Sequence, residues 1–475
     1  MMLILVVLAV AGVSHLHSAE AGTIRIIETG SEYTSIQAAI DAAAHGQTVE
    51  VGPGTYREHI NFRGRNVMVR SEDPDDPAVV AATVIDGGGG GSVVTFVSRE
   101  TASAVLAGFT ITGGSAVDGG GIHCRNTAAT ITGNVIEGNS AGRWGGGISA
   151  LNARPTIVGN TIRGNTANEG GGIHVYNQTP EIRGNVISGN SASSNGGGIY
   201  LISSDATIEN CTISDNSAAR GGGVYLRMSS PTVTNTVIAF SSAGAGIHNT
   251  LSGNPSVTYS NVYGNVAGEY IGMTDPTGDS GNISKDPLFA GGGDYHLQST
   301  GGRWDPGARA WVIDDLHSPC IAAGDPASDY SNEPEPNGDC INMGAYGGTW
   351  QASMAAVSAP PLLSLDSPSP AILWPANGRV IPVSISGSVV DQGGGVGEAW
   401  LQVEDDYGEL DGKHDITGSL GEDGSFSVVL DLIASRRGND RSGRSYEISL
   451  HATSRAGMEA DPVSVIVLVP HNRGR

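Results

Sequence analysis

A block of residues recurs about every 25 positions through the middle of this chain. It reads Gly-Gly-Gly-Ile, a short spacer, and then Ile-x-Gly-Asn-x-Ile-x-Gly-Asn. The Gly-rich part ends in Ile122, Ile148, Ile173, Ile199, Val224 and Ile247, so successive blocks are 26, 25, 26, 25 and 23 residues apart. A period of this length predicts a solenoid, in which each repeat forms one coil and only stacking buries its apolar side.

Three apolar positions recur in each coil. The first file is the set just given, and the other two are Leu106, Ile131, Ile157, Ile182, Ile208, Val233 and Val257, and Ile111, Ile136, Ile162, Ile187, Ile213, Ile238 and Val262. Their spacing is not helical, and short runs of Ile, Val and Thr with alternating sides favour strands. We therefore predict an all-β chain with a parallel β-helix of about ten coils, three strands per coil, and neighbouring coils ~4.8 Å apart.

The corners between these strands carry asparagines in register. One file holds Asn139, Asn165, Asn190, Asn216 and Asn265, with Ser241 as its exception, and a second holds Asn134, Asn160 and Asn185 before it breaks at Cys211. Stacked Asn side chains bond to their copies above and below, and Asn tolerates the left-handed backbone of a tight corner. We interpret these residues as structural.

An amphipathic stretch precedes the coils. Residues 35–44 (SIQAAIDAAA) predict a short helix, and residues 48–58 (TVEVGPGTYRE) predict a strand and a Pro-Gly turn. Together with the repeats, this stretch resembles the amino-terminal cap and coils of the right-handed parallel β-helix proteins, the pectin-lyase-like superfamily. The resemblance covers roughly residues 25–350 and implies the fold. It leaves the activity open, because that superfamily holds lyases, hydrolases, esterases and inert surface proteins.

The two ends of the chain have a different character from the coils. Residues 1–21 read as a secretory signal peptide, which predicts a secreted or cell-surface protein with no membrane span. The β-helix with its cap and closing segment is expected over 22–352, a linker over 353–370, and a β-sandwich over 371–475 that resembles immunoglobulin-like accessory modules. Within the closing segment, we expect Phe289, Trp304 and Trp311 to seal the last coil.

Charge and cysteine content limit the partners and cofactors. The net charge of −23 excludes nucleic acid as a partner, and an acidic polysaccharide would need cations or a local basic patch. Cys320 and Cys340 are expected to form a disulfide in an exported chain, whereas Cys124 and Cys211 are too far apart to bond. No spacing indicates zinc; calcium remains a candidate, through Asp118 or Glu169, or through Asp275, Asp279, Asp314, Asp315 and Asp325. The oligomeric state is left open, with a monomer favoured.

The face beside the Gly-rich blocks is where we expect function. The position after the first apolar file holds His123, Ser149, His174, Tyr200, Tyr225 and His248, and the position before the glycines holds Asp118, Trp144, Glu169, Asn195 and Arg220. Varied side chains on a rigid sheet suit a binding face, and aromatic rings suit sugars. We therefore expect an extracellular polysaccharide to bind through Asp118, His123, Trp144, Glu169, Asn195, Tyr225 and Arg227. An equally weighted interpretation is that these positions only carry β-forming residues.

Whether the chain is an enzyme stays open at this stage. A uronate lyase needs a base next to the carboxylate-bearing carbon and a cation for the developing enolate, and the residues of suitable type are Arg143, His174, Tyr200 and Arg220. A glycoside hydrolase is less favoured, because the paired-Asp and Gly-His-Gly constellation of polygalacturonases is absent from the sequence. The two candidate carboxylates, Asp118 and Glu169, lie two coils apart, ~9.6 Å by strand spacing, at the outer edge of the range for inverting enzymes. The alternative to a polysaccharide-binding protein or lyase is a non-catalytic surface or adhesion protein.

Overall fold

The computed structural model describes residues 22–356, 360–391, 396–421, 423–454 and 458–471 of the chain. The expected signal peptide over 1–21 lies outside the described residues. Two compact units divide between Ala355 and Ala356, and each is described by itself. The division falls inside the predicted linker. Among the described residues, no helix has the length and apolar character needed to cross a membrane.

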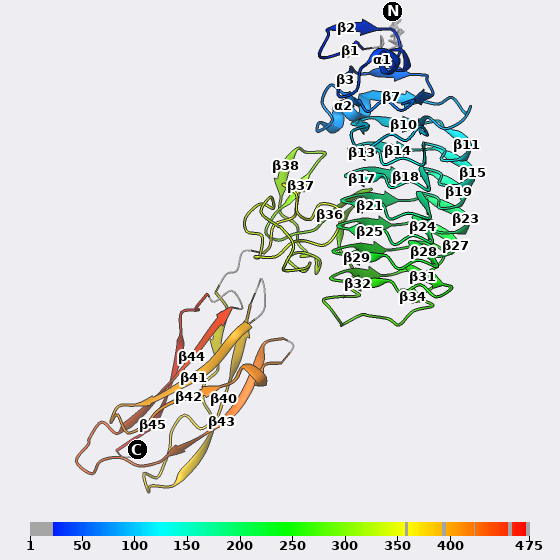
Figure 1. The fold of residues 1–475 in the computed structure, drawn as a ribbon. Helices are drawn as coiled ribbons and strands as arrows, with labels where there is room; N and C mark the ends of the chain where they lie inside the picture. Colours follow the sequence, from blue (N-terminus) through cyan, green and yellow to red (C-terminus); the bar gives the residue numbers. More distant parts are fainter. Residues whose placement is uncertain (1–21, 357–359, 392–395, 422, 455–457, 472–475) are drawn as a thin grey trace, which may run out of the picture. The chain divides into compact units, whose positions relative to one another are not determined.

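The first unit is a β-solenoid of about nine turns, close to the ten that the repeats predict (Figure 1). Three long parallel sheets run along it, here called sheets A, B and C. Sheet A contains β3 (Thr48–Val51), β6 (Met68–Ser71), β9 (Val105–Ala107), β13 (Thr130–Thr132), β17 (Thr156–Val158), β21 (Glu181–Arg183), β25 (Thr207–Glu209), β29 (Thr232–Thr234) and β32 (Ser256–Thr258), with β1 (Ile24–Ile26) and β2 (Ser31–Tyr33) added antiparallel at its start.

Sheets B and C have nine strands each. Sheet B contains β4 (Gly54–Tyr56), β7 (Thr83–Asp86), β10 (Thr110–Thr112), β14 (Val135–Glu137), β18 (Thr161–Arg163), β22 (Val186–Ser188), β26 (Thr212–Ser214), β30 (Val237–Ala239) and β33 (Asn261–Tyr263). Sheet C contains β5 (Ile60–Asn61), β8 (Val94–Phe96), β12 (Ile122–Arg125), β16 (Ile148–Leu151), β20 (Ile173–Tyr176), β24 (Ile199–Ile202), β28 (Val224–Arg227), β31 (Ile247–Thr250) and β34 (Tyr270–Ile271).

The three predicted apolar files form the core. The residues of the first file are 0% exposed, and only Val257 at 6% departs noticeably from full burial in the other two. Register confirms the repeat: Ile148 pairs with Ile173, Ile157 with Ile182, and Ile162 with Ile187. β-Branched residues suit such files because their χ1 is restricted.

The asparagine ladders and the cap are also confirmed. Asn165 Oδ1 accepts from Asn139 N and Nδ2 at 3.0 and 3.1 Å, and its own Nδ2 donates to Asn190 Oδ1 at 3.0 Å. The helix α1 (Ile36–Ala42) starts at Ser35, whose hydroxyl accepts from Ala38 N at 3.1 Å, and it buries Ile36 and Ile40 over the first coil. Such a lid covers apolar edges that a solenoid would otherwise expose. A second short helix, α2 (Pro77–Ala82), lies beside sheet B.

A fourth parallel sheet, sheet D, was not expected from the sequence. It contains β11 (Ser115–Asp118), β15 (Ser140–Trp144), β19 (Thr166–Glu169), β23 (Ser191–Asn195) and β27 (Ser217–Arg220). These strands fill the stretch between sheets B and C, so the central coils have four strands where three were predicted. Figure 1 shows them stacked along one edge of the solenoid.

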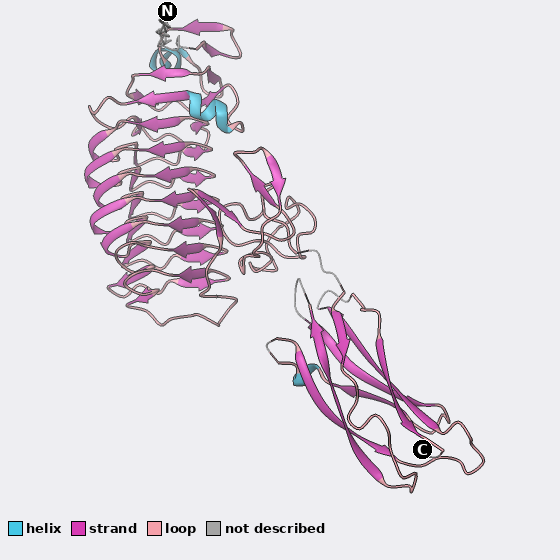
Figure 2. Cartoon of the chain, turned by 180° about the vertical axis from the view of Figure 1, so that it is seen from behind, coloured by secondary structure: helices cyan, strands magenta, loops and turns pink. Residues whose placement is uncertain are grey.

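The residues after the last coil lie beside the solenoid. Residues 286–355, here called the flanking segment, contain β35 (Phe289–Gly291), β36 (Asp294–Leu297), β37 (Arg303–Asp305) and β38 (Ala310–Val312). Figures 1 and 2 show this segment along the side of the coils. Ala345 N donates to Thr212 Oγ1 at 3.0 Å, and Asn210 Nδ2 donates to Asn342 O at 3.1 Å. The prediction that Trp304 and Trp311 seal the last coil is therefore wrong. Trp304 packs with Trp311 and Trp350 inside the flanking segment.

The predicted Cys320–Cys340 disulfide is not formed. Both thiols are free, and each has another partner: Cys320 Sγ lies 3.1 Å from Asn261 Nδ2, and Cys340 Sγ lies 3.2 Å from Gly324 O. Burial raises the pKa of the Cys320 thiol to about 12, so it stays protonated. Cys124 and Cys211 are free and buried, as expected.

The second unit consists of antiparallel sheets that form a sandwich-like region. One sheet joins β39 (Leu362–Leu365), β40 (Val380–Val390) and β43 (Ser425–Ile433); the other joins β41 (Val396–Asp405), β42 (Asp411–Asp415), β44 (Arg444–Ser454) and β45 (Val463–Val469), with a 3-10 turn η1 (Thr417–Ser419). Leu401, Phe426, Ile448 and Val467 belong to its own apolar core. The strand β39 lies inside the predicted linker of 353–370, where its residue Leu363 pairs with Val389 of β40. This part of the predicted linker therefore belongs to the sheet.

Candidate functional site

A left-handed glycine turn connects sheet D to sheet C in each central coil. Gly145, Gly170, Gly196 and Gly221 have φ values of 67°, 68°, 66° and 60°. A Cβ on Gly170 would lie 2.8 Å from His174 Cβ, and one on Gly196 would lie 2.7 Å from Tyr200 Cβ. Only glycine permits this approach. As a result, the last residues of sheet D fold against the outward side of sheet C.

This turn brings four of the eleven predicted site residues, Trp144, His174, Tyr200 and Tyr225, together in one column of rings. Trp144 stacks on His174 with centroids 5.0 Å apart, His174 meets Tyr200 edge-on at 5.4 Å, and Tyr200 meets Tyr225 edge-on at 5.1 Å. His248 continues the column, 5.2 Å from Tyr225. The residues share one face because they occupy equivalent positions in successive coils.

The middle of the column is buried, although we expected these positions to form an accessible binding face. His174 is 0% exposed, Tyr200 1% and Tyr225 5%, and Ser149 is also buried. Trp144 is not a free ring either: besides His174, the Arg143 guanidinium lies 3.7 Å from its centroid. The sequence showed that these residues occupy equivalent positions, but the glycine turn that closes sheet D over them is a three-dimensional effect.

Polar groups above the column bond to one another. Arg143 donates to both carboxylate oxygens of Asp118 at 2.9 and 2.6 Å. Glu169 accepts from Trp144 Nε1 at 3.0 Å and from Asn195 Nδ2 at 2.9 Å. These pairs join neighbouring coils and leave the carboxylates of Asp118 and Glu169 already occupied.

The remaining predicted residues lie at the edges of this strip. Arg220 and Arg227 are exposed, and His123 and His248 are half-buried. Thus Arg220 and Arg227 reach solvent, whereas Tyr200 and Tyr225 are buried and Trp144 is half-buried.

Burial sets the electrostatics of the column. It lowers the pKa of His174 to about 3, and neither ring nitrogen has a hydrogen-bond partner among the described residues. The pKa of Tyr200 rises to about 12 through burial and the charge of Glu169. His174 is therefore a neutral ring at physiological pH, and a general base must reach its substrate to act. The catalytic roles of Arg143, His174, Tyr200 and Arg220 stay predictions, while the geometry gives His174 and Tyr200 a packing role.

Five of the seven carboxylates proposed for calcium, Asp118, Glu169, Asp275, Asp314 and Asp325, have other partners. Within the described ranges, no group of three or more His, Cys, Asp or Glu side chains is arranged to hold a metal ion. Asp314 pairs with Arg303, and Asp275 and Asp325 accept from the backbone of nearby turns at 2.9 Å each.

A second surface, which the sequence did not indicate, is a groove between sheet B and the flanking segment. It consists of two adjoining hollows of about 460 and 530 Å³ that share Gly293 and Tyr295. Glu137, Arg163 and Ser188 form the floor in register from three successive coils. The other hollow is lined by Asp215, Phe240, Asp286, Phe289, Asp294 and Gln298. No repeat marks the flanking segment, so its position could not be predicted.

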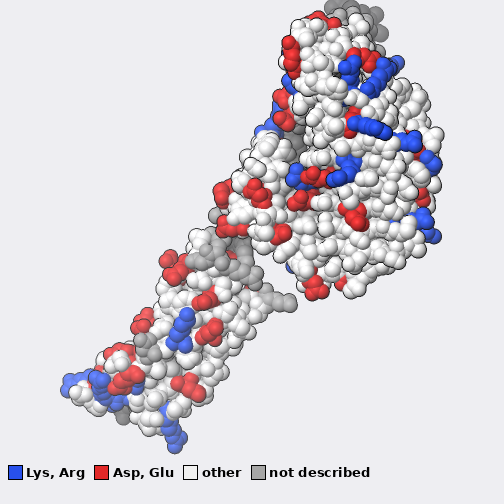
Figure 3. Space-filling view, viewed as in Figure 1, with Lys and Arg blue, Asp and Glu red and all other residues white. Residues whose placement is uncertain are grey.

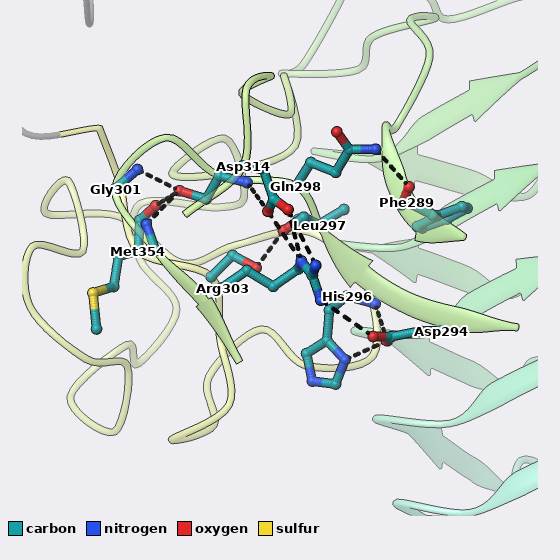
Figure 4. A network of polar contacts seen from close by, with 12 residues as sticks. Phe289, Asp294, His296, Leu297, Gln298, Gly301, Arg303, Asp314 and Met354 are labelled. Carbon is teal, nitrogen blue, oxygen red and sulfur yellow. Dashed lines mark hydrogen bonds and ion pairs between the residues drawn. The ribbon is translucent and has the colours of Figure 1, made fainter. Parts of the chain in front are cut away.

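Tyr295 stands between the two hollows and is fixed at both ends. Its hydroxyl donates to Asp215 Oδ2 at 3.0 Å, and its ring meets Phe289 edge-on with centroids 5.2 Å apart. Figure 4 shows the network behind it: Asp294 accepts from His296 Nδ1 at 2.5 Å and pairs with Arg303, which binds Asp314 at 3.0 Å. Although burial opposes it, hydrogen bonds from His296 and the charge of Arg303 hold the pKa of Asp294 below its usual range. The wall of the groove is therefore rigid.

Comparison with known proteins agrees with the fold. A family model described as a right handed beta helix region matches residues 120–282. No curated protein and no solved structure matches the chain. The β-helix fold is consistent with carbohydrate-active proteins and specifies no single function.

Proposed function

We propose that this protein is exported and binds a polysaccharide chain without cleaving it, with the chain lying in the groove between sheet B and the flanking segment. The observation that carries the proposal is the groove itself. It is an open hollow with a rigid aromatic wall at Tyr295 and polar side chains presented at the spacing of the coils, ~4.8 Å. Sugars bind such surfaces through apolar ring faces on aromatic residues and hydroxyls on polar ones.

Binding is better supported than cleavage. The two sequence-predicted groups that could remove a proton, His174 and Tyr200, are sealed beneath sheet D. The Arg143 cation, which would stabilise an enolate, is neutralised by Asp118 at 2.6 Å. Neither His174 nor Tyr200 can contact a substrate unless the glycine turn opens.

For the same reason, we do not place the binding surface on the Gly-rich face. Trp144, Tyr200 and Tyr225 already use their rings against protein side chains. In the groove, by contrast, Tyr295 lines both hollows.

Binding to a glycan array, followed by calorimetry on the best ligand, tests the proposal. We expect Tyr295→Ala to weaken binding by about tenfold or more. Tyr176→Ala is the matched control, since Tyr176 is a tyrosine on sheet C that is 40% exposed and remote from the groove lining. Unsaturated-end absorbance should stay flat with uronate polysaccharides. A protein that binds no glycan would instead be a rigid stalk, and binding that survives Tyr295→Ala would exclude the groove.

A further inference from the structure

We propose that the groove selects sugar chains that carry no acidic groups and rejects uronates and sulfated glycans. This inference rests on the proposed function and deepens it by naming the class of ligand. It is argued from the charges that line the groove and from the partners that those charges already have.

Carboxylates dominate the lining. Glu137, Asp215, Asp286 and Asp294 line the two hollows, and Arg163 is the cation among the lining residues. Arg163 Nε bonds Glu137 Oε2 at 2.7 Å, so its charge is already balanced. Asp294 is likewise balanced by Arg303. Asp215 and Asp286 remain as exposed negative charges, and within the described part of the chain their hydrogen-bond donors are neutral groups.

The wall of the groove adds to this field. Residues 286–355 carry ten acidic side chains and two arginines, a net charge of −8. The coils between residues 120 and 250 carry seven arginines and six acidic side chains, a net charge of +1. Figure 3 shows acidic side chains over the flanking segment. The flanking segment therefore adds net negative charge on one side of the groove, and this charge raises the free energy of an anionic chain there.

The same carboxylates are good partners for hydroxyl groups. Asp215 Oδ2 accepts from Ser214 Oγ at 2.9 Å and from Tyr295 at 3.0 Å, which orients the carboxylate. Its Oδ1 has no hydrogen-bond donor among the described residues. An ionised carboxylate accepts charge-assisted bonds from neutral O–H donors. A hydroxyl-rich chain can use these acceptors, whereas a chain with its own carboxylates cannot.

Matched pairs of ligands that differ only in charge test the selectivity of the intact protein. Suitable pairs are polygalacturonate and its methyl ester, and gluco- and manno-oligosaccharides with and without oxidation of C6 to a carboxylate. We expect the uncharged member of the bound pair to bind about tenfold more tightly at low ionic strength. Added salt should narrow the difference, because exposed charges are screened.

Charge-removing variants connect the selectivity to the groove. Glu137→Gln frees Arg163, and Asp286→Asn removes an exposed charge; both should reduce the discrimination, whereas Glu32→Gln, a remote exposed carboxylate, should leave it unchanged. If the acidic ligand of a pair binds more tightly than the uncharged one, and Tyr295→Ala abolishes that binding, the inferred selectivity is wrong but the groove is still the binding site. If no member of any pair binds, or if binding survives Tyr295→Ala, the proposed function itself fails.

Discussion

At the scale of single residues, the break in one asparagine ladder shows what each ladder atom contributes. Asn185 Nδ2 donates to Ile157 O and Arg183 O at 2.8 and 3.0 Å. One coil later, Cys211 Sγ takes the place of that nitrogen, 3.4 Å from Ile182 O and 3.3 Å from Glu209 O. The missing part is the side-chain oxygen: on the side of the next coil, Asn185 Nδ2 meets the Cys211 sulfur at 4.0 Å instead of an Asn Oδ1.

Restoring that oxygen should stabilise the protein. In Cys211→Asn, the new Oδ1 would accept from Asn185, as Asn185 Oδ1 accepts from Asn160 N at 2.9 Å. We expect the free energy of unfolding to rise by about 1 kcal/mol, the usual net value of a hydrogen bond. Denaturant unfolding measures it, with Cys211→Ala as the control that restores nothing. A Cys211→Asn protein no more stable than Cys211→Ala would contradict the ladder argument.

The buried His174 should make stability depend on pH. Its pKa is about 3 in the folded chain and roughly 6.5 when unfolded, so below pH 6.5 the unfolded state binds more protons and stability falls as the pH falls. The loss from this residue between about pH 6.5 and 5 is about 2 kcal/mol.

His174→Phe removes that loss while keeping a ring between Trp144 and Tyr200. The difference in unfolding free energy between the variant and the wild type should therefore grow in favour of the variant from pH 7 to pH 5. Ser149→Ala, in the same file but without a titratable group, should keep the wild-type slope. An unchanged slope in His174→Phe would show that His174 is protonated in the folded protein.

At the scale of elements, the glycine turn between sheets D and C should tolerate no side chain. Gly170→Ala places a Cβ 2.8 Å from His174 Cβ and Ile173 O, whereas Gly189, with a similar φ of 61°, has nothing within 4 Å of an added Cβ. We expect Gly189→Ala to cost about 1–2 kcal/mol from left-handed strain, and Gly170→Ala to cost about 3 kcal/mol or more. Thermal unfolding of the pair tests this. Equal losses would mean that sheet D can lift away.

The same scale separates what the sequence could predict from what it could not. Files of Ile and Val with a fixed period determine sheets A, B and C, because a large apolar side chain has to be buried. Sheet D repeats only alanine on its inward side, at Ala116, Ala141, Ala167, Ala192 and Ala218. Alanine is common on both buried and exposed positions, so this file carries little signal.

The candidate site was predictable only in part, for the same reason. Periodicity identified the residues that form the column, since His174 and Tyr200 hold equivalent positions. It could not show that Trp144 covers them, nor that residues 286–355 lie beside sheet B. Both depend on contacts between segments that no repeat connects, such as the one between Thr212 and Ala345.

At the scale of the whole molecule, each of the two units has its own main apolar core, which predicts two unfolding events. One core runs through the solenoid from Ile24 to Val262, and the other lies within Leu373 to Val469 of the second unit. Calorimetry should resolve two transitions. Ile187 is fully buried in the solenoid, so Ile187→Ala should lower the unfolding free energy of the solenoid alone. Ile448 is fully buried in the second unit, so Ile448→Ala should lower the unfolding free energy of that unit alone. We expect each loss to be about 2–5 kcal/mol. Because each deletion leaves the opposite core intact, the two losses should also add in the double variant. A single transition that both variants shift would mean that the units fold as one cooperative structure.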